Sequence, residues 1–337
     1  MNQPRSGCLG FALIASLVLL GLSLLVNLLL LGSSSPMGTA MTTPQKFEES
    51  QIVPAKEKGE SDKIVVIYLR GIISGMEAGN FAETAVDDIR VQFRQAAEDE
   101  KVKAVVLHID SPGGEVTASD TIYNIVRKYR DEKKKPVVVY MGSLAASGGY
   151  YAACAGSHIV ANETTFTGSI GVIMQTLKYK GLFDKVGLES ITFKSGKFKD
   201  MLSGSRDLTD EERDYVQRMV MQTYDKFVGI VAKERKLPED KLRNGIADGR
   251  VITGKDALSE KLVDELGDVE AAYAKAMQLG RSPNARVVRY VANFGLSKFL
   301  RMLGSESKAK VEVNVASPVL PHLEPGRAYY LPSYFAP

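Results

Sequence analysis

One serine lies where a predicted strand gives way to a predicted helix. Residues 137–141 are a β-branched run after a proline, which is typical of a buried strand, and small residues from Tyr151 to Ala155 favour a helix. Ser147 lies between them and is followed by two glycines. The first amides of a helix have no intrahelical partner and can stabilise an oxyanion. Ser147 is therefore a candidate nucleophile, with a simple helix N-cap serine as the alternative.

A serine nucleophile needs a base, and the chain has only three histidines. His108 lies inside a predicted strand, His158 starts a short one, and His322 is in the C-terminal tail. None is in a loop suited to a general base, so each is better interpreted as a core or surface histidine. The remaining option is a lysine, which acts as a base only as the neutral amine. Burial must then lower its pKa from about 10.4 to about 7–8.

Lys199 is the candidate base. It follows Phe198 at the end of a predicted strand and loop, and Lys197 is the fallback. The neighbouring Asp200 would raise the pKa of the amine if it pointed inward, so we expect it to point away. Ser169, a hydroxyl in a glycine turn, could orient the amine by a hydrogen bond. Judged alone, Lys199 would be an ordinary solvated surface lysine.

The elements around these residues alternate between strand and helix. Such alternation favours an α/β body with mostly parallel strands. Two glycine loops, at 110–114 and 147–149, follow successive strands and should face one another at the strands' carboxyl ends, where sites of α/β sheets gather. The predicted strands are 63–73, 103–110 and 137–141, and the predicted helices between them are 84–98 and 117–133.

The second half of the body continues the pattern. A capping box formed by Thr209 and Glu212 predicts a long helix that ends near Arg235. After Gly280 the pattern weakens. The other predicted elements are a short strand at 158–161, a glycine turn at 167–172, a strand at 190–194, a strand, turn and helix within 246–267, and a helix at 268–279.

The composition excludes several classes of protein. A net charge of +3 over 337 residues gives no argument for nucleic-acid binding. The two cysteines, Cys8 and Cys154, are too far apart in the sequence to predict a disulfide framework or a metal site. We therefore expect no metal and no cofactor.

The N-terminus contains a candidate membrane segment. Residues 9–31 carry no charge and are long enough to span a bilayer. The run exceeds the apolar core of a secretory signal, so we expect an uncleaved signal anchor, with cleavage near residues 38–40 as the alternative. Arg5 precedes the run, which favours a cytoplasmic N-terminus and an extracytoplasmic body. The predicted organisation is a short cytoplasmic N-terminus (1–8), a transmembrane anchor (9–31), a flexible tether (32–62), a catalytic domain (63–280), and a C-terminal extension and tail (281–337).

Five motifs in order carry a resemblance to a known family. The chain resembles the signal peptide peptidase A family, which are membrane-anchored serine proteases with a caseinolytic-protease/crotonase-like superhelical α/β fold. The resemblance covers about residues 63–275 and the N-terminal anchor. The motifs are Asp110–Gly114, Ala146–Tyr150, Thr167–Val172, Gly196–Lys199 and Ala247–Val251.

The resemblance implies a role for each site residue. Ser147 would be the nucleophile and Lys199 the general base. The amides of Gly114 and Gly148 would form the oxyanion hole, and the hydroxyl of Ser169 would position the lysine. The length resembles short, single-domain members in which one protomer carries both members of the dyad.

The resemblance also implies partners and a location. The substrates would be remnant signal peptides and other apolar, extended peptides, and the protein would form a homo-oligomeric ring. The chain would lie in the cell membrane as a single-pass protein with an extracytoplasmic catalytic domain.

Three other functions fit part of the sequence. The first is a related membrane serine protease with another membrane-protein substrate, although such proteins typically carry further spans after the protease body. The second is an acyl-CoA hydratase-like enzyme of the same fold class, which would not need an outward-facing anchor. The third is a non-catalytic membrane scaffold.

The C-terminal tail is a candidate ligand for the site. From Ser317 onward it contains five prolines, and residues 329–337 are largely apolar. Such a segment could enter an active site, its own or a neighbour's, as an inhibitor or as a substrate for self-cleavage. The alternative is a disordered end.

Overall fold

The computed structural model describes residues 16–24, 47–57, 59–75, 85–292 and 329–330. Residues 1–45 and 46–337 form two separate compact units. In the first unit, residues 16–24 are helical and their large apolar side chains are exposed. Within the described ranges, no helix combines the length and the apolar character needed to cross a bilayer. The ends of the predicted anchor at 9–31 and all of the N-terminal segment 1–8 lie outside the described residues.

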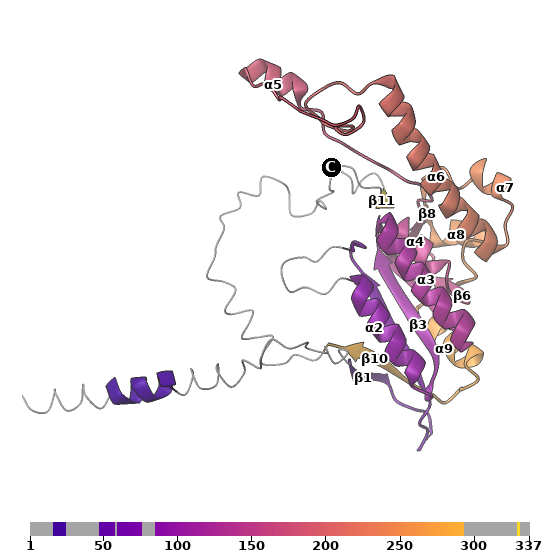
Figure 1. The fold of residues 1–337 in the computed structure, drawn as a ribbon. Helices are drawn as coiled ribbons and strands as arrows, with labels where there is room; N and C mark the ends of the chain where they lie inside the picture. Colours follow the sequence, from indigo (N-terminus) through magenta and orange to yellow (C-terminus); the bar gives the residue numbers. More distant parts are fainter. Residues whose placement is uncertain (1–15, 25–46, 58, 76–84, 293–328, 331–337) are drawn as a thin grey trace, which may run out of the picture. The chain divides into compact units, whose positions relative to one another are not determined.

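A largely parallel sheet forms the centre of the second unit (Figure 1). Its path runs β1-β10-β2-β3-β5-β6-β9, and the pairs β2–β3, β3–β5 and β5–β6 are parallel, as predicted. Their β-branched side chains are buried on both faces, as expected for a sheet covered by helices. The central strands are β2 (Lys63–Arg70), β3 (Val102–Ser111), β5 (Val137–Ala146) and β6 (His158–Ala161).

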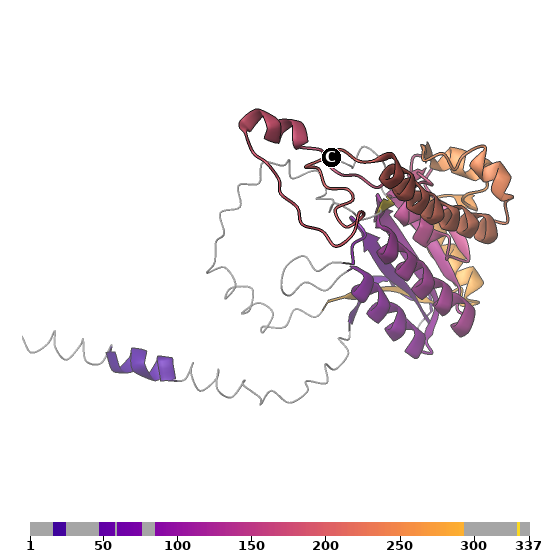
Figure 2. The same cartoon turned by 45° about the horizontal axis from the view of Figure 1, so that its top comes forward.

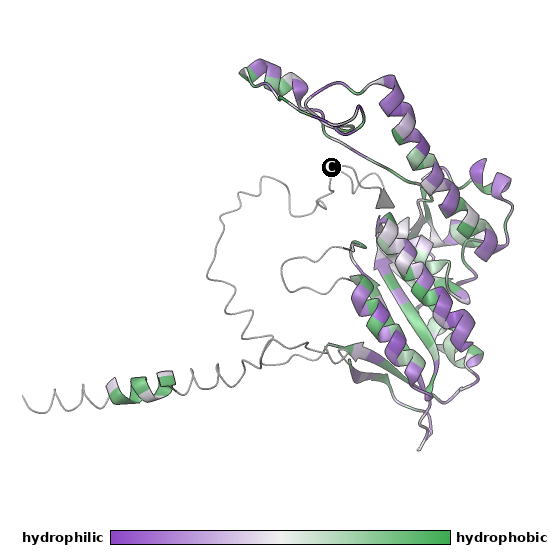
Figure 3. Cartoon of the chain, viewed as in Figure 1, coloured by the Kyte–Doolittle hydropathy of each residue, from purple (hydrophilic) through white to green (hydrophobic). Residues whose placement is uncertain are grey.

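Helices cover both faces of this sheet. One apolar cluster joins the strands to α2, α3, α4 and α6, and a second joins the opposite face to α9 (Figures 1 and 2). Colouring by hydropathy shows apolar strands and helices whose outer faces are polar (Figure 3). The helices are α2 (Ala85–Glu98), α3 (Val116–Lys133), α4 (Gly148–Ala153), α6 (Asp210–Arg235) and α9 (Val269–Leu279).

Two strands lie where the sequence pattern predicted none. β1 (Glu48–Val53) falls in the predicted tether and pairs antiparallel with β10 (Arg286–Val291), which falls in the predicted C-terminal extension. β10 in turn pairs with β2. The sheet therefore extends beyond both of the predicted domain boundaries, 63 and 280. β1 is an edge strand with mostly exposed side chains, so it lacks the apolar alternation that marks a buried strand.

An arm, residues 173–207, leaves the sheet after β7 (Phe166–Gly168). Its helix α5 (Lys180–Val186) lies apart from the sheet in both views (Figures 1 and 2). The strand predicted at 190–194 is irregular here, because strand propensity alone does not hold a segment without a paired neighbour. Apolar side chains on the arm are exposed, among them Leu177, Ile191 and Phe193, and Phe193 is 96% exposed.

The remaining elements are short. The long helix α6 begins with the capping box that the sequence predicted, in which the side chains of Thr209 and Glu212 each bond the other's backbone amide. Among the residues described, these further elements complete the fold: β4 (Gly114–Glu115), α7 (Glu239–Arg243), β8 (Val251–Thr253), α8 (Gly254–Ser259), β9 (Glu265–Leu266) and β11 (Tyr329–Tyr330).

Candidate active site

Ser147 lies at the junction of β5 and α4 in a strained backbone conformation. Its φ is 53° and its ψ is −116°, a left-handed geometry that costs a non-glycine residue on the order of 1–3 kcal/mol. Two hydrogen bonds hold it there. The amide of Ser147 donates to the carbonyl of Gly168 at 2.8 Å, and its own carbonyl accepts the amide of Tyr151 at 2.8 Å.

The hydroxyl of Ser147 has no hydrogen-bond partner among the described residues. The residue is 0% exposed, and its Oγ is buried and unpaired. A buried unpaired polar group costs about 1–3 kcal/mol. Ser147 is the N-cap residue of α4 by position, but its side chain makes no capping bond to the helix. Backbone strain and an unpaired hydroxyl at one residue are typical of functional sites.

The two glycine loops meet at Ser147, as predicted. A Cβ atom on Gly148 would lie 3.2 Å from the amide nitrogen of Gly114 and 2.4 Å from Oγ of Ser119. Gly114 has a φ of 158°, and a Cβ there would lie 2.0 Å from the carbonyl oxygen of Ile73. Glycine is thus required at both positions for the loop to reach the start of α4.

Two residues that we did not select from the sequence hold the 110–114 loop. Oγ of Ser111 donates to the carbonyl of Gly71 at 2.6 Å and accepts the amide of Gly113 at 3.1 Å. The amide of Ile73 donates to the carbonyl of Gly113 at 2.8 Å, and the carbonyl of Ile73 accepts the amide of Glu115 at 2.7 Å. Ser111 carries a sequence signal, because it is a serine between a buried strand and a Pro-Gly-Gly turn. The role of Ile73 depends on tertiary contacts alone.

Ser169 is linked to Ser147 through the residue that precedes it, Gly168. It follows Gly168, whose carbonyl binds the amide of Ser147, and it is itself left-handed with a φ of 50° and 3% exposure. Its amide donates to the carbonyl of Arg250 at 2.8 Å. The predicted motif at 247–251 therefore supports the Ser169 turn.

Lys199 is exposed and is not bonded to the Ser147 hydroxyl. It is an exposed residue of a turn on the arm, where its amide donates to Gly196 O at 3.1 Å. Because the Ser147 hydroxyl has no partner in the described part of the chain, the Lys199 amine is not bonded to it. The structure thus shows no bond between the two members of the expected dyad, and their pairing stays a prediction. The fallback, Lys197, forms an ion pair with Glu211 at 2.6 Å.

Neither described histidine bonds Ser147. The ring of His108 lies between Tyr68 and Tyr140, with centroids 5.1 and 4.9 Å away, and burial lowers its pKa. The Nε2 atom of His158 lies 3.0 Å from the carboxylate of Glu265. Both therefore fit the predicted roles of core and surface histidines. His322 lies outside the described residues.

Cys154 is buried and lies one residue past the end of α4. Burial raises the pKa of its thiol to about 12, so it remains protonated and a poor nucleophile near neutral pH. In the described part of the chain, no group of three or more histidine, cysteine or acidic side chains is placed to hold a metal ion.

Comparison with known proteins shows which family the chain belongs to. The model of Peptidase family S49 matches residues 129–282, and the Clp protease model matches residues 66–166. "Putative signal peptide peptidase SppA" of Enterococcus faecium is 36% identical over 240 residues, which are 69% of this chain and 69% of that protein. The chain belongs to peptidase family S49. This S49 peptidase has the Clp protease-like α/β fold that the motifs implied.

Two longer relatives match about the same share of the S49 chain as the Enterococcus protein does. "Serine protease SPPA, chloroplastic" of Arabidopsis thaliana is 35% identical over 241 residues, which are 69% of this chain and 35% of that protein. "Protease 4" of Salmonella typhi is 38% identical over 237 residues, 70% of this chain and 37% of that protein. The S49 chain thus spans only about a third of either of these relatives.

Replacing Gly114 by alanine should abolish peptidase activity. The added Cβ would collide with the Ile73 carbonyl and displace the amide that faces Gly148. Loss of one oxyanion donor alone lowers kcat by about 10²–10³. The assay is peptide hydrolysis, with folding checked by circular dichroism.

Gly181→Ala is the matched control, because a Cβ on this arm glycine meets nothing within 4 Å. That variant should keep its activity. A Gly114→Ala protein that is folded and fully active would show that the loop is not part of the site.

Proposed function

We propose that this S49 peptidase is a membrane-anchored serine endopeptidase that degrades remnant signal peptides and other apolar peptides with a Ser147/Lys199 dyad. The observation that carries the proposal is Ser147 itself, whose backbone is strained and whose hydroxyl is buried and unpaired beside Gly114 and Gly148. No other described serine combines left-handed backbone with a buried hydroxyl that lacks a partner.

The chemistry follows the order of events in acyl transfer. Neutral Lys199 accepts the proton of Ser147, and Oγ attacks the scissile carbonyl carbon. The amides of Gly114 and Gly148 stabilise the tetrahedral oxyanion, at about 3–4 kcal/mol per donor. Protonated Lys199 gives the proton to the leaving amine, and the acyl-enzyme forms. Water, deprotonated by the same lysine, then releases the acid product.

An extended peptide is the substrate that this site favours. β4 carries Gly114, which lies beside Gly148 at the start of the Ser147 helix. A substrate that adds a strand along β4 would place its carbonyl beside both amides and its side chains in alternating pockets. Remnant signal peptides are apolar and can extend in this way.

The exposed position of Lys199 supports assembly into a homo-oligomer. A lysine acts as a base only when it is neutral, and burial favours the neutral form. Lys199 is exposed on an arm whose apolar side chains are also exposed. Packing that arm against a neighbouring copy would bury both, and would bring Lys199 of one protomer to Ser147 of the next. A ring follows if each copy donates to the next one.

The pairing of β11 supports a role for the C-terminal tail. Tyr329 pairs with Glu115 and Tyr330 with Gly114, in an antiparallel ladder on β4. These are the backbone positions that we assign to the substrate. We propose that the tail competes with substrate for the site.

The first compact unit supports membrane anchoring. Residues 16–24 form a helix with large apolar side chains 58–68% exposed, as expected of a helix that faces lipid. We propose a single-pass anchor at 9–31 in the cell membrane, with the N-terminus cytoplasmic and the catalytic domain extracytoplasmic. Sharing a membrane with signal remnants raises the local substrate concentration.

Replacing either dyad residue should abolish hydrolysis of an apolar, signal-like peptide by the full chain in detergent. We expect Ser147→Ala and Lys199→Ala each to lower kcat by about 10⁴ or more, because nucleophile and base act as a unit. If Lys199→Ala keeps its activity, another group is the base. If the unaltered protein has none, the scaffold interpretation gains support.

Mixing the two inactive variants tests where the dyad forms. If Lys199 comes from a neighbouring protomer, an equimolar mixture that exchanges subunits has both residues intact at about a quarter of its sites. The recovered activity should therefore approach a quarter of the unaltered level. A mixed oligomer that stays inactive would place both residues on one chain.

The full chain should remain with membranes after extraction with alkaline carbonate. A chain that begins at Lys46, the start of the second compact unit, should be released. The reason is that the uncharged segment 9–31 is the only predicted anchor. Release of the full chain would contradict membrane anchoring, and retention of the shortened chain would place the membrane contact in the catalytic unit.

Deleting the residues after Pro318 should raise peptidase activity. The rise should be about tenfold if the tail fills about nine sites in ten. Tyr330→Pro is the second variant, because it keeps the length of the tail and removes one backbone donor from β11. Activity that is unchanged in both variants would exclude an inhibitory tail.

A further inference from the structure

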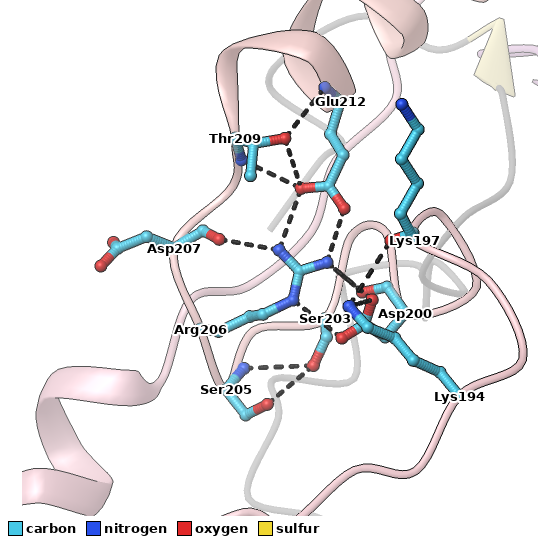
Figure 4. A network of polar contacts seen from close by, with 9 residues as sticks. All are labelled: Lys194, Lys197, Asp200, Ser203, Ser205, Arg206, Asp207, Thr209 and Glu212. Atoms are coloured by element: carbon cyan, nitrogen blue, oxygen red, sulfur yellow. Dashed lines mark hydrogen bonds and ion pairs between the residues drawn. The ribbon is translucent and has the colours of Figure 1, made fainter.

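Charged side chains form a network of polar contacts around Asp200 and Arg206 (Figure 4). The guanidinium of Arg206 forms two hydrogen bonds with the carboxylate of Asp200, the residue next to Lys199 in the sequence. Nε of Arg206 donates to one Asp200 oxygen at 2.8 Å, and its NH2 group donates to the other at 2.7 Å. This fork is the strongest common geometry for an arginine and a carboxylate.

Arg206 is itself fixed by a second carboxylate. Its NH1 and NH2 groups donate to the two oxygens of Glu212, at 2.9 and 2.5 Å. Glu212 also accepts the amide of Thr209 at 2.9 Å and caps the first turn of α6. Its side chain is only 4% exposed, and Arg206 lowers its pKa to about 2. The arginine therefore ties the Lys199 turn to the start of α6.

Lys194 completes the shell of Asp200. Its amine lies 2.7 Å from the Asp200 oxygen that also accepts from NH2 of Arg206. Arg206 and then Lys194 hold the pKa of the Asp200 carboxyl well below its usual range. The Asp200 side chain is 11% exposed and faces two cations.

Two other charged groups near the turn, Lys197 and Asp207, are also paired. Lys197 binds Glu211, and Asp207 binds Lys178. The carbonyl of Asp207 accepts from NH1 of Arg206 at 2.9 Å. The acid that adjoins Lys199 in the sequence is thus occupied by partners other than Lys199.

We propose that Arg206 is a positioning residue for the general base, because it holds the Asp200 carboxylate in a fork and so keeps that charge away from the Lys199 amine. The inference rests on the proposed function, in which Lys199 is the base. A freed carboxylate one residue away would stabilise the protonated amine and suppress the base. The cluster offsets that effect while it also orders the turn.

The two sides of the ion pair should shift the pH–rate profile in opposite directions. In Arg206→Ala the Asp200 carboxylate loses its forked partner and keeps only Lys194, so its charge favours protonated Lys199 and the acid limb of kcat/KM should move up by about 0.5–1 pH unit. In Asp200→Asn the remaining cations favour the neutral amine, so the limb should move down. The double variant should return close to the unaltered position. The measurement is kcat/KM against pH with the full chain in detergent.

Arg243→Ala is the matched control. Arg243 also bridges two carboxylates, Asp225 at 2.7 Å and Glu239 at 3.2 Å, and its side chain has nearly the same exposure as that of Arg206, 30% against 29%. It is the last residue of α7 and links that helix to Asp225 of α6, so its loss should leave the acid limb in place. This variant separates a general effect of losing a surface arginine from an effect on the base.

Three outcomes decide between the interpretations. Opposite shifts with recovery in the double variant support the inference. If the acid limbs do not move and the melting temperature falls, the cluster has only a structural role and the inference is overturned. Asp200→Asn provides this test even if Arg206→Ala fails to fold. Activity that persists in Lys199→Ala would overturn the proposed base itself, and this inference with it.

Discussion

The left-handed backbone of Ser147 is the constraint on which the site depends. It holds because its amide is bonded to Gly168 and its carbonyl to Tyr151, which ties β7 and α4 to one residue. In this backbone conformation the side chain makes no capping bond to α4, and its hydroxyl is buried without a partner among the described residues. The sheet beneath is buried on both faces, so it is rigid enough to keep this costly geometry in place.

The residues of the proposed dyad lie on two different parts of the second unit, the sheet and the arm. Ser147 and Gly148 join the end of β5 to α4, Gly114 begins β4, and all three are buried where close packing fixes distances. Lys199 lies on an arm with exposed apolar side chains, where the Arg206 cluster supplies local order in place of a core. A single exposed ion pair stabilises little, but a forked arginine shared by two carboxylates restricts a turn more strongly.

The edge next to Gly114 has more than one possible occupant. β4 is two residues long and accepts a strand, and in this chain β11 provides one. A site that recognises backbone in an extended form cannot easily distinguish a substrate from a tail of the same protein. Selectivity would then depend on side-chain pockets and on the local concentration of each peptide.

The sequence by itself determined the alternating parallel sheet, the meeting of the two glycine loops and the capping box of α6. Each of these depends on local signals, namely β-branched runs, glycines after strands and a Thr-x-x-Glu pattern. Only the tertiary structure decided the strain at Ser147, the contact of Ile73 with the 110–114 loop, and the pairing of β1 with β10. It also decided that the Ser147 hydroxyl has no partner among the described residues and that Asp200 faces Arg206. These features arise from contacts between residues far apart in the sequence, and a polar edge strand or an exposed arm leaves no periodic pattern by which to predict them.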